Sequence, residues 1–303
     1  MVEIGVLLPT REAVMYGDGS GDPRPLVDLA VNAEAAGFDS VWAGDSLLAR
    51  PRAEPLTLLA GVATRTSSVR LGTAVLLPSL RNAEQLAQAT ATLDALSGGR
   101  FILGIGAGPG TPGVAVDHGL VGTDFERRAS LSWTVVERVR GLWLGTDGDQ
   151  VYPLPGSADG PAIWCGGSGP RTLERAGRGA DGWFPTATTP ERFAAGLARV
   201  REVAEAAGRN PADVVGAAYL TVVFGAAAPA EKALHEHSEL YYGVPHAIIA
   251  EQQGSIAGPE AMVGAWLREF IDAGAEHLCV RVGCEDVRTQ LETLSGLLGE
   301  LRR

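Results

Sequence analysis

The amino-acid sequence predicts an α/β protein built as a single (β/α)8 barrel, or TIM barrel, over residues 1–303. Three observations support this prediction. Short apolar runs alternate with longer segments of helical periodicity along the whole chain, which is the pattern of a repeated βα unit. No stretch rich in proline or serine, and no change in composition, divides the chain into two domains. The length of 303 residues also suits the fold, because such a barrel commonly occupies about 250 residues or more.

Eight apolar runs are expected to be strands, near residues 3–9, 40–44, 70–77, 100–106, 161–166, 181–185, 214–224 and 277–283. Helices are expected near residues 25–36, 54–66, 82–97, 125–144, 170–178, 190–207, 229–241, 259–273 and 286–302. Several helices carry start and stop signals, because proline lacks the N–H that a first turn leaves unpaired and glycine accepts a left-handed cap. The pairs that bracket a helix are Pro25 with Gly37, Pro190 with Gly208, and Pro259 with Gly274.

The closure of the strands follows from their composition. None of the eight runs shows the polar alternation of an exposed edge strand, so a closed barrel is preferred to an open doubly wound sheet, which stays as the alternative. Two connections, 107–123 and 241–258, are too long to serve only as links, and the second contains Tyr241, Tyr242 and His246. Barrels carry their ligand-binding loops at the C-terminal ends of the strands, so we expect both insertions to cover a ligand at that rim.

Charge and cysteine content limit the partners and the compartment. The formal net charge is −11, so the overall field repels phosphate backbones and anionic lipids, and neither nucleic acid nor a membrane is expected as a partner. Cys165, Cys279 and Cys284 form no CxxC pair, which fits a reducing compartment. The chain opens without a basic leader or a long apolar span. A cytoplasmic location is therefore expected.

Several barrel chemistries lack the residues that they need. Lys232 is the only lysine and lies in a predicted helix, so a Schiff base inside the barrel has no amine. The histidines include no HxH pair on a strand, and His235 and His237, two apart on a helix, face different ways. We therefore expect no metal site. No GxSxG motif is present to hold a hydrolase nucleophile.

Two glycine-rich segments directly follow predicted strands. The segment 104–110 does not satisfy GxGxxG, and Pro109 and Pro112 interrupt an immediate helix, so it is not a dinucleotide fingerprint. Its missing side chains would let a flat ring approach the backbone, although a simple flexible loop is the alternative. The segment 165–172 reads Cys-Gly-Gly-Ser-Gly-Pro-Arg-Thr and places N–H groups and a hydroxyl ahead of a helix, an arrangement that anions favour.

Four ordered blocks resemble the luciferase-like monooxygenase family. They are FDSVWAGD at 38–45, VRLGTAVLLP at 69–78, LDALSGGRFILGIG at 93–106 and RAGRGADGW at 175–183. The match runs from the first strand to the last helix. The resemblance implies a TIM barrel that binds FMN or the deazaflavin coenzyme F420 at the ends of its strands.

The resemblance also implies the residues of the site. Asp45 stands at the end of the second strand beside the redox ring as the catalytic group, although an acidic residue there is also a common turn-former. In deazaflavin members the bulge after the third strand includes a non-prolyl cis peptide, and Ala74–Val75 is the matching bond. The residues expected to bind the cofactor are Trp42, Ser46, Thr73, Ala74, Val75, Gly106, Ala107, Gly108, Gly166, Gly167, Ser168, Gly169 and Arg171.

Two departures from the family pattern matter. Many relatives place a histidine after the aspartate of the second strand to move a substrate proton; here that residue is Ser46, so the proton-transfer residue stays open. FMN-binding members carry an arginine in the glycine loop, and Ala107 in its place favours F420. Trp42 is either barrel core or a wall beside the ring. Arg50 and Arg52 are either solvated or in contact with an acidic cofactor tail.

The sequence thus predicts an oxidoreductase that uses F420 to move a hydride to or from a small organic substrate. One alternative is an FMN-dependent monooxygenase supplied by a partner flavin reductase, and another is a flavin-binding barrel without turnover. The resemblance also suggests a homodimer. The substrate stays undetermined, because it is set by the loops 10–24, 107–123 and 241–258.

Overall fold

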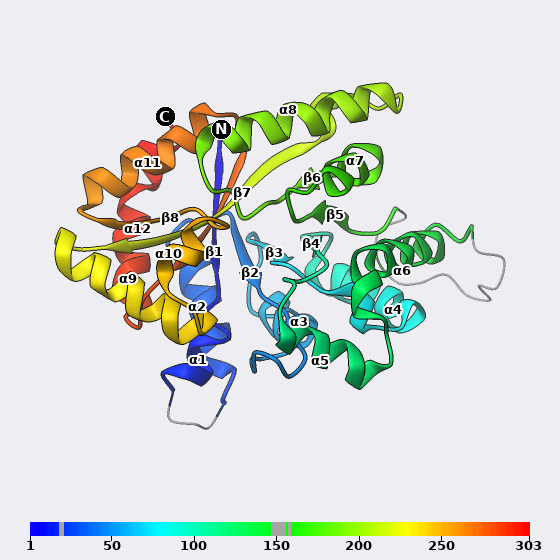
Figure 1. The fold of residues 1–303 in the computed structure, drawn as a ribbon, viewed down its shortest axis with the longest axis horizontal. Helices are drawn as coiled ribbons and strands as arrows, with labels where there is room; N and C mark the ends of the chain where they lie inside the picture. The colour runs from blue at the N-terminus through cyan, green and yellow to red at the C-terminus, as the bar shows by residue number, and fades with distance from the viewer. Residues whose placement is uncertain (18–20, 147–155, 157–158) are drawn as a thin grey trace.

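Eight parallel strands close into a barrel (Figure 1). A computed structural model describes residues 1–17, 21–146, 156 and 159–303 of the protein. The strands pair in the order β1-β2-β3-β4-β5-β6-β7-β9, and β9 pairs with β1 to complete the ring. They are β1 (Glu3–Leu7), β2 (Ser40–Ala43), β3 (Arg70–Thr73), β4 (Phe101–Ile105), β5 (Ala162–Cys165), β6 (Gly182–Trp183), β7 (Val215–Phe224) and β9 (His277–Val282). The predicted (β/α)8 barrel is confirmed, and the open sheet is excluded.

The predicted helices are all confirmed, and most of them surround the barrel (Figure 1). They are α2 (Arg24–Ala35), α3 (Pro55–Ala63), α4 (Ala83–Ser97), α6 (Arg128–Trp143), α7 (Pro170–Gly179), α8 (Pro190–Ala206), α9 (Ala227–Tyr242), α11 (Glu260–Asp272) and α12 (Val287–Leu301). Gly37, Gly208 and Gly274 follow their helices with φ of +88°, +77° and +99°, as left-handed residues. No helix in the described part of the chain is long and apolar enough to cross a membrane.

The sequence did not reveal the shorter elements. These are α1 (Glu12–Met15), α5 (Pro112–Val121), α10 (His246–Ala250), the extra strand β8 (Ser255–Gly258), and the 3-10 turns η1 (Pro78–Leu80), η2 (Phe125–Arg127) and η3 (Pro211–Asp213). The segment 241–258 is thus not a plain connection: it holds the end of α9, all of α10 and all of β8. Apart from α5, these elements are three to five residues long, which is too short for periodicity to identify them.

Strand β7 pairs with two different strands along one of its edges. Near its start Gly216 pairs with Trp183 of β6, and further on Thr221 to Phe224 pair with β8. The other edge pairs with β9 from Ala217 to Val222. Because β6 is only two residues long, β8 takes over the edge that β6 leaves. The barrel therefore stays closed while the rim gains one strand.

Large aromatic side chains fill the interior of the barrel. Trp42 and Trp164 are 0% and 1% exposed, and their ring centroids lie 5.2 Å apart. Glycines on neighbouring strands make room for them. A Cβ on Gly72 would lie 2.2 Å from the Trp42 ring, and a Cβ on Gly182 would lie 2.7 Å from the Trp164 ring. The interior is thus a packed core that blocks any channel through the barrel.

A chain of hydrogen bonds crosses the barrel near the start of its strands. Trp42 Nε1 donates to Ser40 Oγ at 2.6 Å, and Ser40 Oγ lies 2.9 Å from His277 Nε2. His277 Nδ1 lies 3.1 Å from Glu3 Oε2. Because an indole N–H can only donate, the Ser40 hydroxyl accepts from Trp42 and donates its own hydrogen bond to His277 Nε2. The ring proton of His277 is then on Nδ1, facing Glu3. Burial, together with the Arg70 guanidinium, lowers the pKa of His277 to about 3, so the ring is neutral.

Candidate active site

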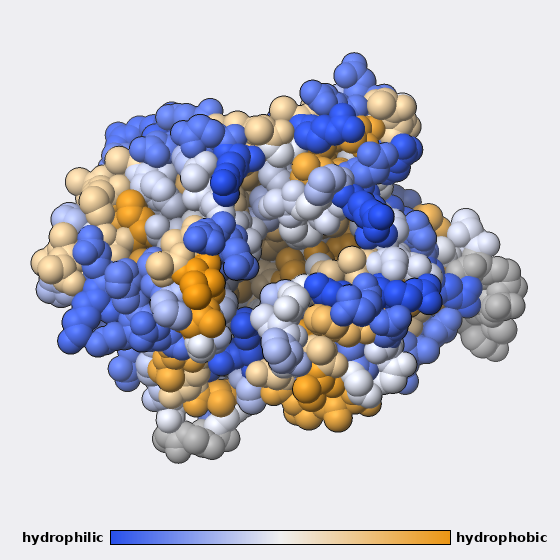
Figure 2. Space-filling model, viewed as in Figure 1, coloured by the Kyte–Doolittle hydropathy of each residue, from blue (hydrophilic) through white to orange (hydrophobic). Residues whose placement is uncertain are grey.

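A hollow opens over the C-terminal ends of the strands. Figure 2 shows it near the centre of the face, with apolar residues on its floor and hydrophilic residues around it. In the same view, β2, β3 and β4 lie behind it (Figure 1). The segment after β3 forms part of this rim, with Ala74 and Val75 only partly buried, and the Ala74–Val75 peptide is cis, as predicted.

Three strand ends meet at the side chain of Val75. A Cβ on Gly106, just after β4, would lie 2.6 Å from Val75 Cγ2. A Cβ on Gly166, just after β5, would lie 3.2 Å from Val75 Cγ1 and 3.2 Å from the carbonyl oxygen of Ile105. Any larger residue at these two positions would crowd Val75. The glycines therefore make room for the Val75 side chain, which can stand at the rim because neither neighbouring strand end carries a side chain there.

Asp45 holds the segment that follows the bulge. Its carboxylate forms a two-pronged ion pair with Arg81, with Nη1–Oδ2 at 2.6 Å and Nη2–Oδ1 at 2.9 Å, and it also accepts the N–H of Leu77 at 2.9 Å. The Asp45 side chain is 2% exposed. Burial opposes ionisation of Arg81, but the Asp45 and Glu54 carboxylates outweigh it and raise the pKa of the guanidinium. Asp45 thus ties β2 to the loop after β3.

Three other predicted site residues make contacts within the protein. Trp42 lies in the barrel interior, 0% exposed. Thr73, also fully buried, donates its hydroxyl to the carbonyl of Gly104 at 2.7 Å and thereby joins β3 to β4. Ser46 accepts the N–H of Arg50 at 3.0 Å and closes the turn after β2. These side chains support the strand ends through contacts within the protein.

The loop after β5 leads into the N-terminus of α7. Gly167, Ser168 and Gly169 are exposed, and Gly167 has φ +102°, which suits a residue without a Cβ. Trp183 donates its indole N–H to the Gly167 carbonyl at 2.9 Å and fixes the loop to β6. The free N–H groups at the start of a ten-residue helix attract an anion, so this loop can hold a phosphate.

A shallow surface pocket lies at the same helix end. It is lined by Pro170, Arg171, Glu174 and Arg175. Arg171 is exposed and makes no hydrogen bond or ion pair with any described residue, whereas Arg175 donates to the carbonyl of Ala129 at 3.0 Å. The predicted residues Gly166, Gly167, Ser168, Gly169 and Arg171 are therefore gathered around one helix end, next to the Val75 side of the barrel.

Helix α5 fastens two of the loops at the rim. Asp117 is fully buried, and its Oδ1 accepts the N–H groups of Leu48 and Ala49 at 3.0 and 2.9 Å. The next residue, His118, is also fully buried and joins Ser79 Oγ through Nε2 at 3.1 Å. The insertion 107–123 thus reaches the loops after β2 and after β3. Ala107 and Gly108, at its start, are partly exposed beside the hollow.

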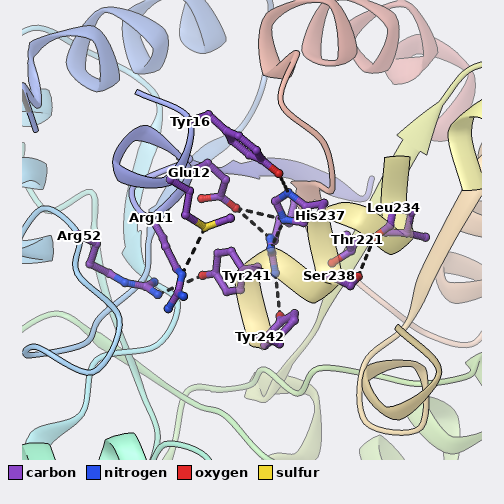
Figure 3. Close-up of polar contacts among 12 residues, drawn as sticks. Arg11, Glu12, Tyr16, Arg52, Thr221, Leu234, His237, Ser238, Tyr241 and Tyr242 are labelled. Atoms are coloured by element: carbon purple, nitrogen blue, oxygen red, sulfur yellow. Dashed lines mark hydrogen bonds and ion pairs between the residues drawn. The ribbon is translucent and has the colours of Figure 1, made fainter. Parts of the chain in front are cut away.

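Arg281 is the centre of a buried polar network, and its partners Glu12, His237 and Tyr242 are labelled in Figure 3. It is 2% exposed, with Nε 3.2 Å from Glu12 Oε1 and Nη1 2.7 Å from the hydroxyl of Tyr242. Its Nη2 donates to His237 Nε2, so the ring proton lies on Nδ1, which faces the hydroxyl of Tyr16 at 3.1 Å. Burial, with Arg281 and Arg11 nearby, lowers the pKa of His237 to about 3.

Sequence reasoning missed the two arginines that organise the site. Arg81 follows its partner Asp45 by 36 residues, and nothing in the local sequence links them. Arg281 did leave a signal: it is the one charged residue between Leu278 and Val282, in an otherwise apolar strand. Arg281 also lies four residues after His277 and therefore on the same face of β9. Because His277 points into the barrel, the Arg281 side chain is directed inward as well.

The geometry can be compared with proteins of known activity. A family model described as luciferase-like monooxygenase matches residues 2–278. An F420-dependent glucose-6-phosphate dehydrogenase of Mycolicibacterium gilvum is 31% identical, over 89% of this chain and 91% of its own. A 5,10-methylenetetrahydromethanopterin reductase of Methanolobus tindarius is 33% identical, over 64% of this chain and 60% of its own. A solved F420-dependent secondary alcohol dehydrogenase superposes with TM-score 0.80 at 19% identity, covering 100% and 99% of the two chains. This chain belongs to the luciferase-like monooxygenase family.

Proposed function

We propose that this protein is an F420-dependent oxidoreductase of the cytoplasm that transfers a hydride to or from a small organic substrate. One observation carries the proposal: the ends of β3, β4 and β5 meet at Val75, where Gly106 and Gly166 make room for its partly buried side chain at the rim. The 31% identical relative supports the choice of cofactor, because it is F420-dependent.

The residues present fit a deazaflavin. Gly106 and Gly166 let the Val75 side chain stand between the ends of β4 and β5, and the partly buried Ala74 and Val75 would support one face of a flat tricyclic ring. Ala107 and Gly108 would lie along the chain of the cofactor. The N–H groups of Gly167, Ser168 and Gly169 would hold its phosphate before α7, with Arg171 as a free counter-charge.

The protein's share of the reaction is to hold and orient. When bound, the deazaflavin supplies the carbon that gives or accepts the hydride. Asp45 and Arg81 fix the segment after the bulge, so that Val75 supports one face of the ring site. The opposite side of the hollow stays open to substrate. Such fixed geometry lowers the entropic cost of bringing the two reacting carbons together.

Titration of the purified full chain with F420 and with FMN, followed by fluorescence, tests the proposal. We expect micromolar or tighter binding of F420 and weaker binding of FMN, because Ala107 offers no guanidinium to the FMN phosphate. Tighter binding of FMN, with oxygen consumption that depends on reduced FMN and a flavin reductase, would replace F420 by the monooxygenase alternative.

Gly106→Ala tests whether the bare junction is the ring site. Its new Cβ would crowd Val75, so we expect F420 affinity to fall by about tenfold or more while the fold survives, because only the tip of a side chain is in the way. Gly296→Ala in α12 is the matched control, since a Cβ there meets nothing within 4 Å. Equal F420 affinity in both variants would place the ring elsewhere.

The predicted homodimer is part of the proposal. Size-exclusion chromatography with light scattering, on the protein with and without F420, distinguishes a dimer from a monomer.

Absence of turnover with F420 bound tightly would favour the third alternative, a flavin-binding barrel without catalysis.

A further inference from the structure

Arg11, Arg50 and Arg52 lie close to the rings of Tyr241 and Tyr242, and Figure 3 labels Arg11 and Arg52 beside Tyr241. The guanidinium of Arg11 lies 4.7 Å from the ring centroid of Tyr241, and that of Arg52 lies 5.8 Å from it. Arg52 Nη2 also donates to the hydroxyl of Tyr241 at 3.1 Å. Arg50 lies 5.1 Å from the ring centroid of Tyr242. These arginines come from the loops after β1 and β2, and the tyrosines close α9.

The positive charges of this arginine cluster, Arg11, Arg50 and Arg52, have no carboxylate partner among the described residues. The neighbouring acids are engaged elsewhere, since Glu12 pairs with Arg281 and Asp45 pairs with Arg81. The Nη1 of Arg11 is buried and makes no hydrogen bond within the part of the chain that the structure describes. A buried guanidinium nitrogen without an acceptor is costly, so its acceptor is expected from a ligand.

Repulsion among the three guanidinium charges also indicates that the cluster binds an anion. Burial lowers the pKa of Arg11, and the charges of Arg50 and Arg52 lower it further. The whole chain carries a net charge of −11, so a cluster of three arginines is a local positive patch on a negatively charged protein. Bound oxyanions remove this repulsion, and a planar guanidinium matches the geometry of carboxylate and phosphate oxygens.

The cluster adjoins the ring site but lies away from the phosphate loop. A Cβ built on Gly44 would lie 2.4 Å from Arg52 Nη1 and 3.6 Å from the carbonyl oxygen of Ala74, so both atoms are close to one point. The loop from Gly166 to α7, by contrast, lies across the barrel from α1 and α9 (Figure 1). A cofactor that reaches from Val75 toward α7 therefore leaves the arginines facing the open, substrate side.

We propose that Arg11, Arg50 and Arg52, with the Tyr241 hydroxyl, form an oxyanion subsite that binds a carboxylate or phosphate group of the substrate beside the redox ring. This inference rests on the proposed function for its placement, and it adds the substrate class: a small organic anion. The arginines orient the substrate by its charged end, which directs the reacting carbon toward Val75 and the ring. They take no part in the hydride step itself.

Calorimetric titration of the full chain with inorganic phosphate, in a low-salt buffer without F420, tests the subsite directly. We expect saturable binding to the wild type and a loss of about tenfold or more in Arg52→Gln, because hydrogen bonds to charged groups are involved. Arg50→Gln is the second variant, since its side chain makes no hydrogen bond to a described residue and its loss should not disturb the fold. Arg199→Gln on the exposed face of α8 removes the same charge far from the hollow and should bind phosphate as the wild type does.

A second arm identifies the source of the anion. With F420 added to saturation, we expect the phosphate affinity to persist and the F420 affinity of Arg52→Gln to stay within about threefold of the wild type. Loss of the Arg52-dependent phosphate binding when F420 is added, or a tenfold loss of F420 affinity in Arg52→Gln, would assign the cluster to the cofactor and overturn the proposal. Equal phosphate binding in Arg52→Gln and Arg199→Gln would overturn it as well. Failure of F420 to bind refutes the proposed function alone, because the first titration contains no cofactor.

Discussion

At the scale of single residues, the position of Asp45 was predictable and its partner was not. The sequence placed an aspartate at the end of β2, beside the rim. The structure adds Arg81 and the N–H of Leu77, which together occupy both carboxylate oxygens. An acid or base that exchanges protons with substrate needs a free oxygen within reach. These contacts favour a positioning role, while the catalytic role of Asp45 stays a prediction.

Asp45→Asn separates the two roles. The change leaves the partly buried Arg81 charge with the exposed Glu54 as its remaining carboxylate partner, so we expect a loss of about 3 kcal/mol in unfolding free energy and weaker F420 binding. Urea unfolding and the fluorescence titration measure both. Asp28→Asn, in an exposed pair with Arg65 at 3.6 Å, is the control and should cost at most about 0.5 kcal/mol. Wild-type stability and F420 affinity, with turnover lost, would instead make Asp45 the catalytic group.

At the scale of elements, helix α5 is the piece that joins the rim loops. It was not visible in the sequence, because glycines and prolines surround it and ten residues offer few apolar positions. Through Asp117 and His118 it reaches the turn after β2 and the turn after β3. These are the two turns that carry Asp45 and the residues beyond the bulge. The geometry of the proposed ring site would thus depend on an insertion that lies outside the barrel.

Asp117→Ala should loosen the turn after β2. The N–H groups of Leu48 and Ala49 lose their acceptor, and we expect their hydrogen exchange to quicken by roughly tenfold or more. Val116→Ala is the matched control on the same helix, because Val116 is 61% exposed. Unchanged exchange at Leu48 and Ala49 in the Asp117 variant would show that the turn is held by other contacts.

The elements show how far the sequence carries a prediction. The barrel strands and the longer helices follow from apolar runs and from proline and glycine boundaries, and all of them were found. The position of Gly106 and Gly166 directly after β4 and β5 also followed, while their use by a cofactor stays a prediction. Side-chain pairing did not follow: Trp42 lies inside the barrel although its neighbour Asp45 reaches the rim. Alternation gives the face of a strand but not the depth at which a side chain ends.

At the scale of the whole molecule, the two ends of the barrel have different chemistry. The start of the strands holds the chain from Trp42 through Ser40 and His277 to Glu3, which is satisfied within the protein. The ends of the strands hold glycines and, among the described residues, three arginines without a carboxylate partner. The satisfied network thus lies at one end of the barrel and the proposed ligand site at the other, which is the usual arrangement for this fold.

The neutral state of His277 makes stability depend on pH. The folded pKa is about 3 and the unfolded value is 6.5, so only the unfolded chain takes up this proton between those limits. The stabilisation is fully present above pH 6.5 and is lost as the pH falls toward 3, by about 1.4 kcal/mol per pH unit. In His277→Gln, urea midpoints between pH 7 and pH 5 should fall less steeply than in the wild type. Parallel slopes would mean that His277 is already charged in the folded state.

The division of β7 between two partners has a consequence for how new specificities can arise. Its first two residues pair with β6 and its last four with β8, while β9 pairs with the other edge from Ala217 to Val222. Exchange of residues 243–258 for another sequence would therefore remodel one wall without opening the ring. Residues 243–258 can therefore change during evolution, and with them the substrate that this wall recognises. The residues proposed to hold the redox ring would stay the same.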